Sequence, residues 1–200
     1  MKKLLCAAAA CLLVFSLAAC GNTQSPAEET TAPAAAGEKP VAVITVKNYG
    51  TIRVELDPSA APITVENFVN LVNDGFYDGL TFHRIISGFM IQGGDPTGTG
   101  MGGSEKTIKG EFAENGVENP IPHARGTISM ARAMDPDSAS SQFFIVHEHS
   151  SFLDGSYAGF GTVLEGMEVV DAICEKTPVA DGNGTVEPEN QPVIESIVME

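Results

Sequence analysis

The 200-residue chain contains no tryptophan and only four cysteines. Cys6, Cys11 and Cys20 fall within the first twenty residues, so only Cys174 lies in the remainder. A single cysteine cannot build a disulfide framework, which excludes the small disulfide-rich scaffolds. Cys174 lies in an apolar helical pattern, and we expect it to be a small buried hydrophobe rather than a reactive thiol.

Basic residues are scarce as well. Lys and Arg together number 11 against 26 Asp and Glu, which gives a formal net charge of −15. Such a surface repels phosphate backbones, so we expect no nucleic-acid partner. The 21 glycines and 12 prolines disfavour a helical bundle and favour a fold of short strands and turns.

The uncharged apolar segment at residues 4–19 is shorter than the roughly 20 residues that a membrane span needs. It follows Lys2 and Lys3, and this order is typical of a signal peptide. The segment ends in a motif that resembles a bacterial lipobox, Leu17-Ala18-Ala19-Cys20. We therefore expect a lipoprotein signal at residues 1–19 and lipidation of Cys20. An ordinary secretory signal with a chance cysteine is the alternative.

Residues 20–40 are rich in Ala, Pro, Thr and Glu and hold no bulky apolar side chain after Cys20. They cannot contribute to a core, so we expect a disordered tether with a reach of roughly 25 Å. The folded domain would then occupy residues 41–200. The expected location is the outer face of a bacterial membrane, where the lipid on Cys20 anchors an exported and monomeric protein.

Within the domain, alternation of apolar and polar residues predominates. The segments 41–46 and 51–56 flank a short turn and predict a hairpin. Further strands are expected at 81–86, 89–92, 127–131, 142–146, 160–163 and 193–199. Helical spacing predicts a helix that begins at Pro62 and another at 165–175. This pattern predicts a mainly β fold, a closed antiparallel barrel of about eight strands capped by two helices.

One apolar stretch, residues 82–95, contains a single arginine, Arg84, and ends near Gly93 and Gly94. Burying a guanidinium group without partners is very unfavourable. From the residues alone, two interpretations stay open. Arg84 either buries its apolar stem and extends its charged end to solvent, or it lies on the floor of a polar cleft and has a function there.

Three blocks of sequence, in the same order and with similar spacing, resemble the cyclophilins, a family of peptidyl-prolyl cis-trans isomerases. The blocks are residues 82–95, then 126–131 with 141–145, and finally 152–155 with 160–161 and 163–167. The resemblance covers nearly all of residues 41–200. It implies the cyclophilin fold, isomerisation of X-Pro bonds without cofactor or metal, and unfolded or proline-containing polypeptides as partners.

The resemblance gives Arg84 a catalytic role. Rotation of a prolyl peptide bond breaks amide resonance, with a barrier near 18–20 kcal/mol. The prolyl nitrogen regains its lone pair in the twisted state, so a hydrogen-bond donor stabilises that state more than the planar one. The guanidinium of Arg84 is always protonated and can be this donor.

The resemblance also implies a binding site around Arg84. An apolar pocket for the proline ring would be lined by Phe89, Met90, Phe144 and Leu153. Phe152 and Tyr157 would lie at its rim. Polar contacts with the substrate would come from the side chains of Gln92 and Gln142 and from the backbone of Ala131 and Arg132. Taken alone, the apolar residues could equally be barrel core, and Gln142 could equally satisfy backbone groups of the barrel.

Phe152 stands where eukaryotic cyclophilins typically have tryptophan, and Tyr157 stands where they have histidine. The loss of the indole N–H removes one donor, so we expect weak binding of cyclosporin. His147 and His149 lie on one face of a strand, as zinc ligands can, but a solvated strand end is the favoured interpretation. A proline-peptide binding module, or a holdase chaperone with little turnover, is the alternative function.

Overall fold

The structure is a computed structural model that describes residues 39–200. The expected signal peptide, Cys20 and nearly all of the tether lie outside this part. The last two tether residues already contact the fold, since Lys39 Nζ lies 2.8 Å from Asp57 and the Pro40 carbonyl accepts the Leu56 N–H over 2.8 Å. None of the described helices is long and apolar enough to cross a membrane.

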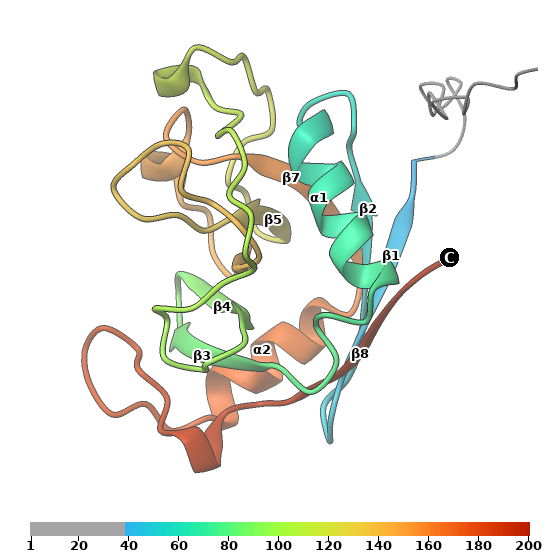
Figure 1. The fold of residues 1–200 in the computed structure, drawn as a ribbon. Helices are drawn as coiled ribbons and strands as arrows, with labels where there is room; N and C mark the ends of the chain where they lie inside the picture. Colours follow the sequence, from blue (N-terminus) through green and yellow to red (C-terminus); the bar gives the residue numbers. More distant parts are fainter. Residues whose placement is uncertain (1–38) are drawn as a thin grey trace, which may run out of the picture. The chain divides into compact units, whose positions relative to one another are not determined.

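Eight antiparallel strands form one curled sheet in the order β3-β4-β6-β5-β7-β2-β1-β8. The sheet strands are β1 (Val41–Val46), β2 (Gly50–Leu56), β3 (Thr81–Ile86), β4 (Met90–Asp95), β5 (Thr127–Met130), β6 (Phe143–Val146), β7 (Gly159–Glu165) and β8 (Ile194–Met199). The helices are α1 (Pro62–Asn73) and α2 (Met167–Lys176). Short 3-10 turns are η1 (Ala113–Asn115), η2 (Ser151–Leu153) and η3 (Pro188–Asn190). Figure 1 shows the curl of the sheet and the separate positions of the two helices along it.

The mainly β, antiparallel architecture with two helices is confirmed, but the closed barrel is not. The two edge strands, β3 and β8, come close only next to their ends. Thr81 and Val193 form an isolated bridge, and the Ile194 N–H donates to the Leu80 carbonyl over 2.8 Å. A continuous ladder between β3 and β8 is missing from the described residues, so the sheet is an open, curled half-barrel.

The core lies inside the curl, where alternate side chains of β1 and β2 are buried. The ring of Phe68 from α1 is at its centre, with centroids 5.2 Å from Tyr77, 5.6 Å from Phe143 and 5.3 Å from Phe160. From α2, Val170 is fully buried in the same cluster. Burial of large aromatic side chains provides much of the stabilisation in such a core.

Helix α1 is capped from a distant part of the chain. The residue before Pro62 is alanine and offers no side-chain cap. The buried carboxylate of Glu111 accepts the N–H groups of Ile63 and Thr64 over 3.0 and 2.8 Å, and the Thr64 hydroxyl over 2.7 Å. A carboxylate at this end of a helix satisfies free N–H groups and complements the helix dipole.

The glycine pair that ends the arginine-containing stretch is needed for close packing. A Cβ atom on Gly93 would lie 2.7 Å from the Thr81 carbonyl oxygen, and one on Gly94 would lie 2.6 Å from the Ser141 carbonyl oxygen. Gly94 also has a φ of +83°, which side chains disfavour. These contacts fix β4 between β3 and the start of β6.

Candidate active site

Arg84 lies on β3 directly opposite Gln92 on β4. Its guanidinium makes two hydrogen bonds to described residues, from Nη1 to Gln92 Oε1 over 3.3 Å and from Nε to the Asn183 carbonyl over 2.8 Å. The side chain is partly exposed. Arg84 is therefore neither buried without partners nor free in solvent, because two acceptors on different elements set the plane of its guanidinium.

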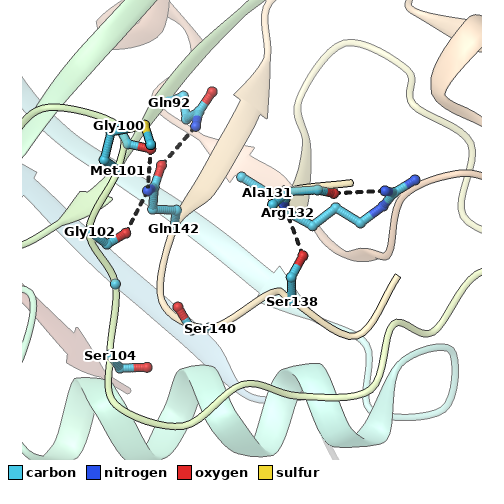
Figure 2. A pocket seen from close by; sticks show the side chains of 12 residues that line it. Gln92, Gly100, Met101, Gly102, Ser104, Ala131, Arg132, Ser138, Ser140 and Gln142 are labelled. Carbon is cyan, nitrogen blue, oxygen red and sulfur yellow. Dashed lines mark hydrogen bonds between the residues drawn. The ribbon is translucent and has the colours of Figure 1, made fainter. Parts of the chain in front are cut away.

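Gln92 is in turn held by Gln142. Its Nε2 donates to Gln142 Oε1 over 2.8 Å, and Gln142 Nε2 donates to the carbonyls of Gly100 and Gly102 over 3.0 and 2.7 Å. Figure 2 shows Gln142 between Gln92 and this glycine-rich loop. The amide of Gln142 thus satisfies loop carbonyls, so the structure supports its bracing role and leaves substrate contact as a prediction.

These two glutamines, together with Ala131 and Arg132, line a cavity of about 430 Å³. The rest of the lining comes from the loop at residues 100–104 and from Ala133, Ser138 and Ser140. The four residues predicted to make polar substrate contacts are therefore brought together around one cavity. Arg84 does not line it, but it is hydrogen-bonded to Gln92 at its edge.

The predicted apolar pocket residues form a second cluster, separate from the main core. Its buried members are Met90, Ala131, Phe144, Val146 and Leu153, and Ile86, Phe89 and Tyr157 pack against them. Phe152 is 72% exposed, and its ring centroid lies 5.3 Å from that of Phe89. This separation from the core supports the pocket interpretation, and Val146 and Ile86 are members that sequence reasoning missed.

The guanidinium of Arg132 is held between two aromatic rings. Its carbon lies 4.9 Å from the centroid of Phe112 and 4.8 Å from that of Tyr157. Its nitrogens donate to the carbonyls of Ser156 over 2.9 Å and of Ala133 over 2.9 Å. Arg132 thereby connects the apolar cluster, through Tyr157, with the loop that borders the cavity.

Behind Phe144, three polar side chains form a relay that the sequence did not suggest. His123 Nδ1 lies 2.9 Å from Asp154 Oδ1, and His123 Nε2 lies 2.9 Å from Ser129 Oγ. The imidazole ring stacks on Phe144 at a centroid distance of 6.0 Å. The spacing is that of a hydrolase triad, but Ser129 is fully buried, so no substrate reaches it and the relay supports the apolar cluster.

Two buried groups next to β4 have shifted pKa values. Burial lowers the pKa of His83, while the charge of Asp95 partly opposes this effect. The Asp95 carboxylate accepts the N–H groups of Thr97, Thr99 and Gly100 over 2.7, 3.1 and 2.6 Å. These bonds lower the pKa of Asp95 against the opposing effect of burial, which is the largest single influence. Asp95 thus fixes the loop that carries the Gly100 carbonyl.

His147 is not a solvated strand end, because both of its ring nitrogens have protein partners. Its Nδ1 accepts the Gly88 N–H over 2.8 Å, and its Nε2 lies 3.1 Å from Asp171 Oδ1 on α2. His147 thus links the β3–β4 turn to α2, while His149 is exposed. Among residues 39–200, no group of three His, Cys, Asp or Glu side chains is placed to hold a metal ion.

The curled sheet and the two helices place the chain in a class of solved proteins. A crystal structure of a cyclophilin-type peptidyl-prolyl cis-trans isomerase from Cryptosporidium parvum, in the presence of the dipeptide Ala-Pro, superposes with a TM-score of 0.70 at 34% identity. The match covers 80% of this chain and 98% of that one. A cyclophilin from Hirschia baltica has a TM-score of 0.64 at 28% identity, over 80% of this chain and 73% of that one.

Sequence comparisons agree with this class. The family model of the cyclophilin type peptidyl-prolyl cis-trans isomerases matches residues 41–199. Peptidyl-prolyl cis-trans isomerase B of Bacillus subtilis is 54% identical over 58% of this chain and 78% of its own length. Peptidyl-prolyl cis-trans isomerase A of Dickeya dadantii is 44% identical over 72% of this chain and 76% of its own length. The chain belongs to the cyclophilin-type peptidyl-prolyl cis-trans isomerases, which are enzymes.

Proposed function

We propose that this isomerase acts on X-Pro bonds of exported or surface proteins and that Arg84 stabilises the twisted bond. The observation that carries the proposal is the fixed guanidinium of Arg84 beside the separate apolar cluster. Two of its N–H groups are engaged by Asn183 and Gln92, which leaves the others available. A donor with a fixed direction stabilises a transition state without reorganisation cost.

In this mechanism the proline ring enters the apolar cluster, with Phe89, Met90, Phe144 and Leu153 as its walls. Phe152 and Tyr157 cover the rim. The Ala131 carbonyl and the Arg132 N–H have no hydrogen-bond partner within residues 39–200. We assign them to the backbone of the residue before proline, which would hold the peptide on one side of the rotating bond.

Arg84 then donates to the prolyl nitrogen as the bond twists. The planar ground state offers no lone pair there, so the hydrogen bond forms fully only in the transition state and lowers the barrier. The reaction needs no nucleophile and no proton transfer. Gln92 keeps the guanidinium oriented, and Gln142 keeps Gln92 in place.

The test compares wild type with Arg84→Ala in NMR exchange measurements on an X-Pro peptide. Arg53→Ala is the matched control, because Arg53 is an arginine on β2 that pairs with Glu165 and Glu200. We expect Arg84→Ala to lose at least about tenfold in catalysed rate, equivalent to about 1.4 kcal/mol in the barrier. Equal catalysed rates for wild type and Arg84→Ala would show that Arg84 is not the catalyst, and a wild-type rate no faster than uncatalysed exchange would favour a binding module or a holdase.

The cellular location is proposed from the first twenty residues alone, whose order of basic, apolar and lipobox-like segments supports export and lipidation of Cys20. An acidic domain on a tether would then work outside the membrane, where exported chains fold. Mass spectrometry of the mature N-terminus tests this. A lipid-modified Cys20 supports the proposal, and an unmodified or uncleaved N-terminus contradicts it.

A further inference from the structure

We propose that Asp181 is a positioning residue for Arg84, acting through the backbone turn at residues 181–185. The proposal rests on the catalytic role of Arg84 proposed above. The starting observation is the 2.8 Å hydrogen bond from Arg84 Nε to the carbonyl of Asn183. This acceptor lies 99 residues away in sequence, in a loop between α2 and β8 that takes no other part in the site.

The side chain of Asp181 shapes this turn. Its Oδ1 accepts the N–H groups of Asn183 and Thr185 over 2.9 and 3.1 Å, and its Oδ2 accepts the Thr185 hydroxyl over 3.0 Å. The Asp181 carbonyl also accepts the Gly184 N–H over 3.2 Å. A side chain that binds its own backbone two and four residues ahead stabilises one turn conformation against alternatives.

The turn is docked on the free edge of β3. The Gly184 carbonyl accepts the Ile85 N–H over 2.8 Å, and Thr185 forms an isolated bridge with Arg84. Gly184 has a φ of +80°, and a Cβ atom there would contact the Ile85 carbonyl oxygen. The docking of the turn on β3 therefore requires the turn to keep its backbone conformation. The hydrogen bonds of Asp181 stabilise that conformation.

The consequence is a guanidinium held from both sides. The Asn183 carbonyl fixes the Nε end and Gln92 Oε1 fixes Nη1. If the turn loosens, the Nε acceptor is lost and the long side chain regains rotamers. Affinity for the planar peptide comes from the apolar cluster and should persist. Loss of direction at Arg84 should therefore lower the catalysed rate and leave peptide affinity nearly unchanged.

The role depends on the hydrogen bonds of Asp181 rather than on its charge. Asp181 is exposed, so a Coulomb interaction with the site would be weak in water. An asparagine at this position keeps an oxygen that can accept the N–H groups of Asn183 and Thr185. Asp181→Asn should therefore keep the catalysed rate that Asp181→Ala loses.

The experiment measures the catalysed exchange rate of an X-Pro peptide at saturation, and the peptide Kd by NMR titration. We expect Asp181→Ala to reduce the saturated rate about fivefold with the Kd within about twofold of wild type. Asp181→Asn should be close to wild type. Asp57→Ala is the control, because Asp57 also accepts the N–H of the residue two ahead, Ser59, at the end of β2.

A double-mutant cycle separates this proposal from the one on which it rests. If Asp181 acts through Arg84, Asp181→Ala should change nothing further in the Arg84→Ala background. If Arg84→Ala itself has no effect, the proposed catalytic role fails first. If Arg84→Ala is impaired but Asp181→Ala matches wild type, or if both backgrounds lose the same factor, the positioning role is overturned. Circular dichroism of each variant confirms that it folds.

Discussion

Gln92 and Gln142 are joined head to tail, with Gln92 Nε2 donating to Gln142 Oε1 over 2.8 Å. This bond determines which end of the Gln92 amide faces Arg84, because an amide has a donor end and an acceptor end. With Nε2 engaged by Gln142, Oε1 is left for the guanidinium. The orientation of Arg84 thus depends on a residue that it does not touch.

Gln142→Met should reduce the catalysed exchange rate about fivefold, because Gln92 loses the partner that sets its direction. Two bonds from Gln142 to the carbonyls of Gly100 and Gly102 are lost as well, each worth about 1 kcal/mol. NMR exchange and urea unfolding measure the two effects. Asn119→Leu is the matched control, since its amide braces backbone carbonyls of Glu111 and Gly159. A Gln142→Met rate equal to wild type would contradict the dependence of Arg84 on the hydrogen bonds from Gln142 through Gln92.

Arg132→Lys should lower the free energy of unfolding by about 1–2 kcal/mol. A lysine keeps the charge but cannot stack flat between Phe112 and Tyr157 while donating to several carbonyls. Arg53→Lys is the control, and we expect it to cost much less because exposed ion pairs contribute little. Urea unfolding at pH 7 gives both values. An equal loss of unfolding free energy in the two variants would show that stacking between the aromatic rings does not stabilise the protein.

The sequence predicted well those parts of the fold that depend on local patterns. The period-2 segments became β1 and β2, and the helix from Pro62 was confirmed as α1. The second helix begins at Met167 rather than at residue 165, because Glu165 belongs to β7 and Gly166 adopts a φ of +96°. Boundaries of this kind depend on backbone conformation that apolar spacing does not encode.

The parts that the sequence did not predict depend on contacts between distant residues. Nothing near Pro62 indicates that Glu111 caps its helix, and nothing near Arg84 indicates that Asn183 binds it. Closure of the sheet was overestimated for the same reason, since strand number alone does not determine whether the edges form a ladder. The candidate site residues were predicted only through resemblance to a family, because apolar residues beside an arginine also fit a plain core.

The stability of the protein should fall as the pH is lowered from 7 to 5.5, because of buried histidines. His83 is 5% exposed, and its ring nitrogens have no partner among residues 39–200. Burial lowers the pKa of His83, and burial does the same to His123. The unfolded chain takes up protons near pH 6.5 that the folded protein does not, so acidification favours unfolding, by at most about 1.3 kcal/mol per histidine.

Urea unfolding across this range measures the effect, and carboxylates contribute little because they titrate below about pH 5. His83→Leu removes one titrating group, so its stability should depend less on pH than that of wild type. His149→Gln, at an exposed position, is the matched control for replacing a histidine. A His83→Leu slope equal to that of wild type would contradict the assignment.

Phe152→Trp should increase the affinity for cyclosporin at least about tenfold. Phe152 is 72% exposed and its ring contacts Phe89 at a centroid distance of 5.3 Å, so an indole can replace its ring at the rim without repacking. The new N–H supplies the donor whose absence predicts weak binding in the wild type. Because the chain has no tryptophan, the introduced indole is the only one, and its fluorescence reports the titration directly. Leu164→Trp, at another exposed apolar position, provides a fluorescent control away from the cluster. An affinity of Phe152→Trp no higher than that of Leu164→Trp would show that the missing indole does not limit binding.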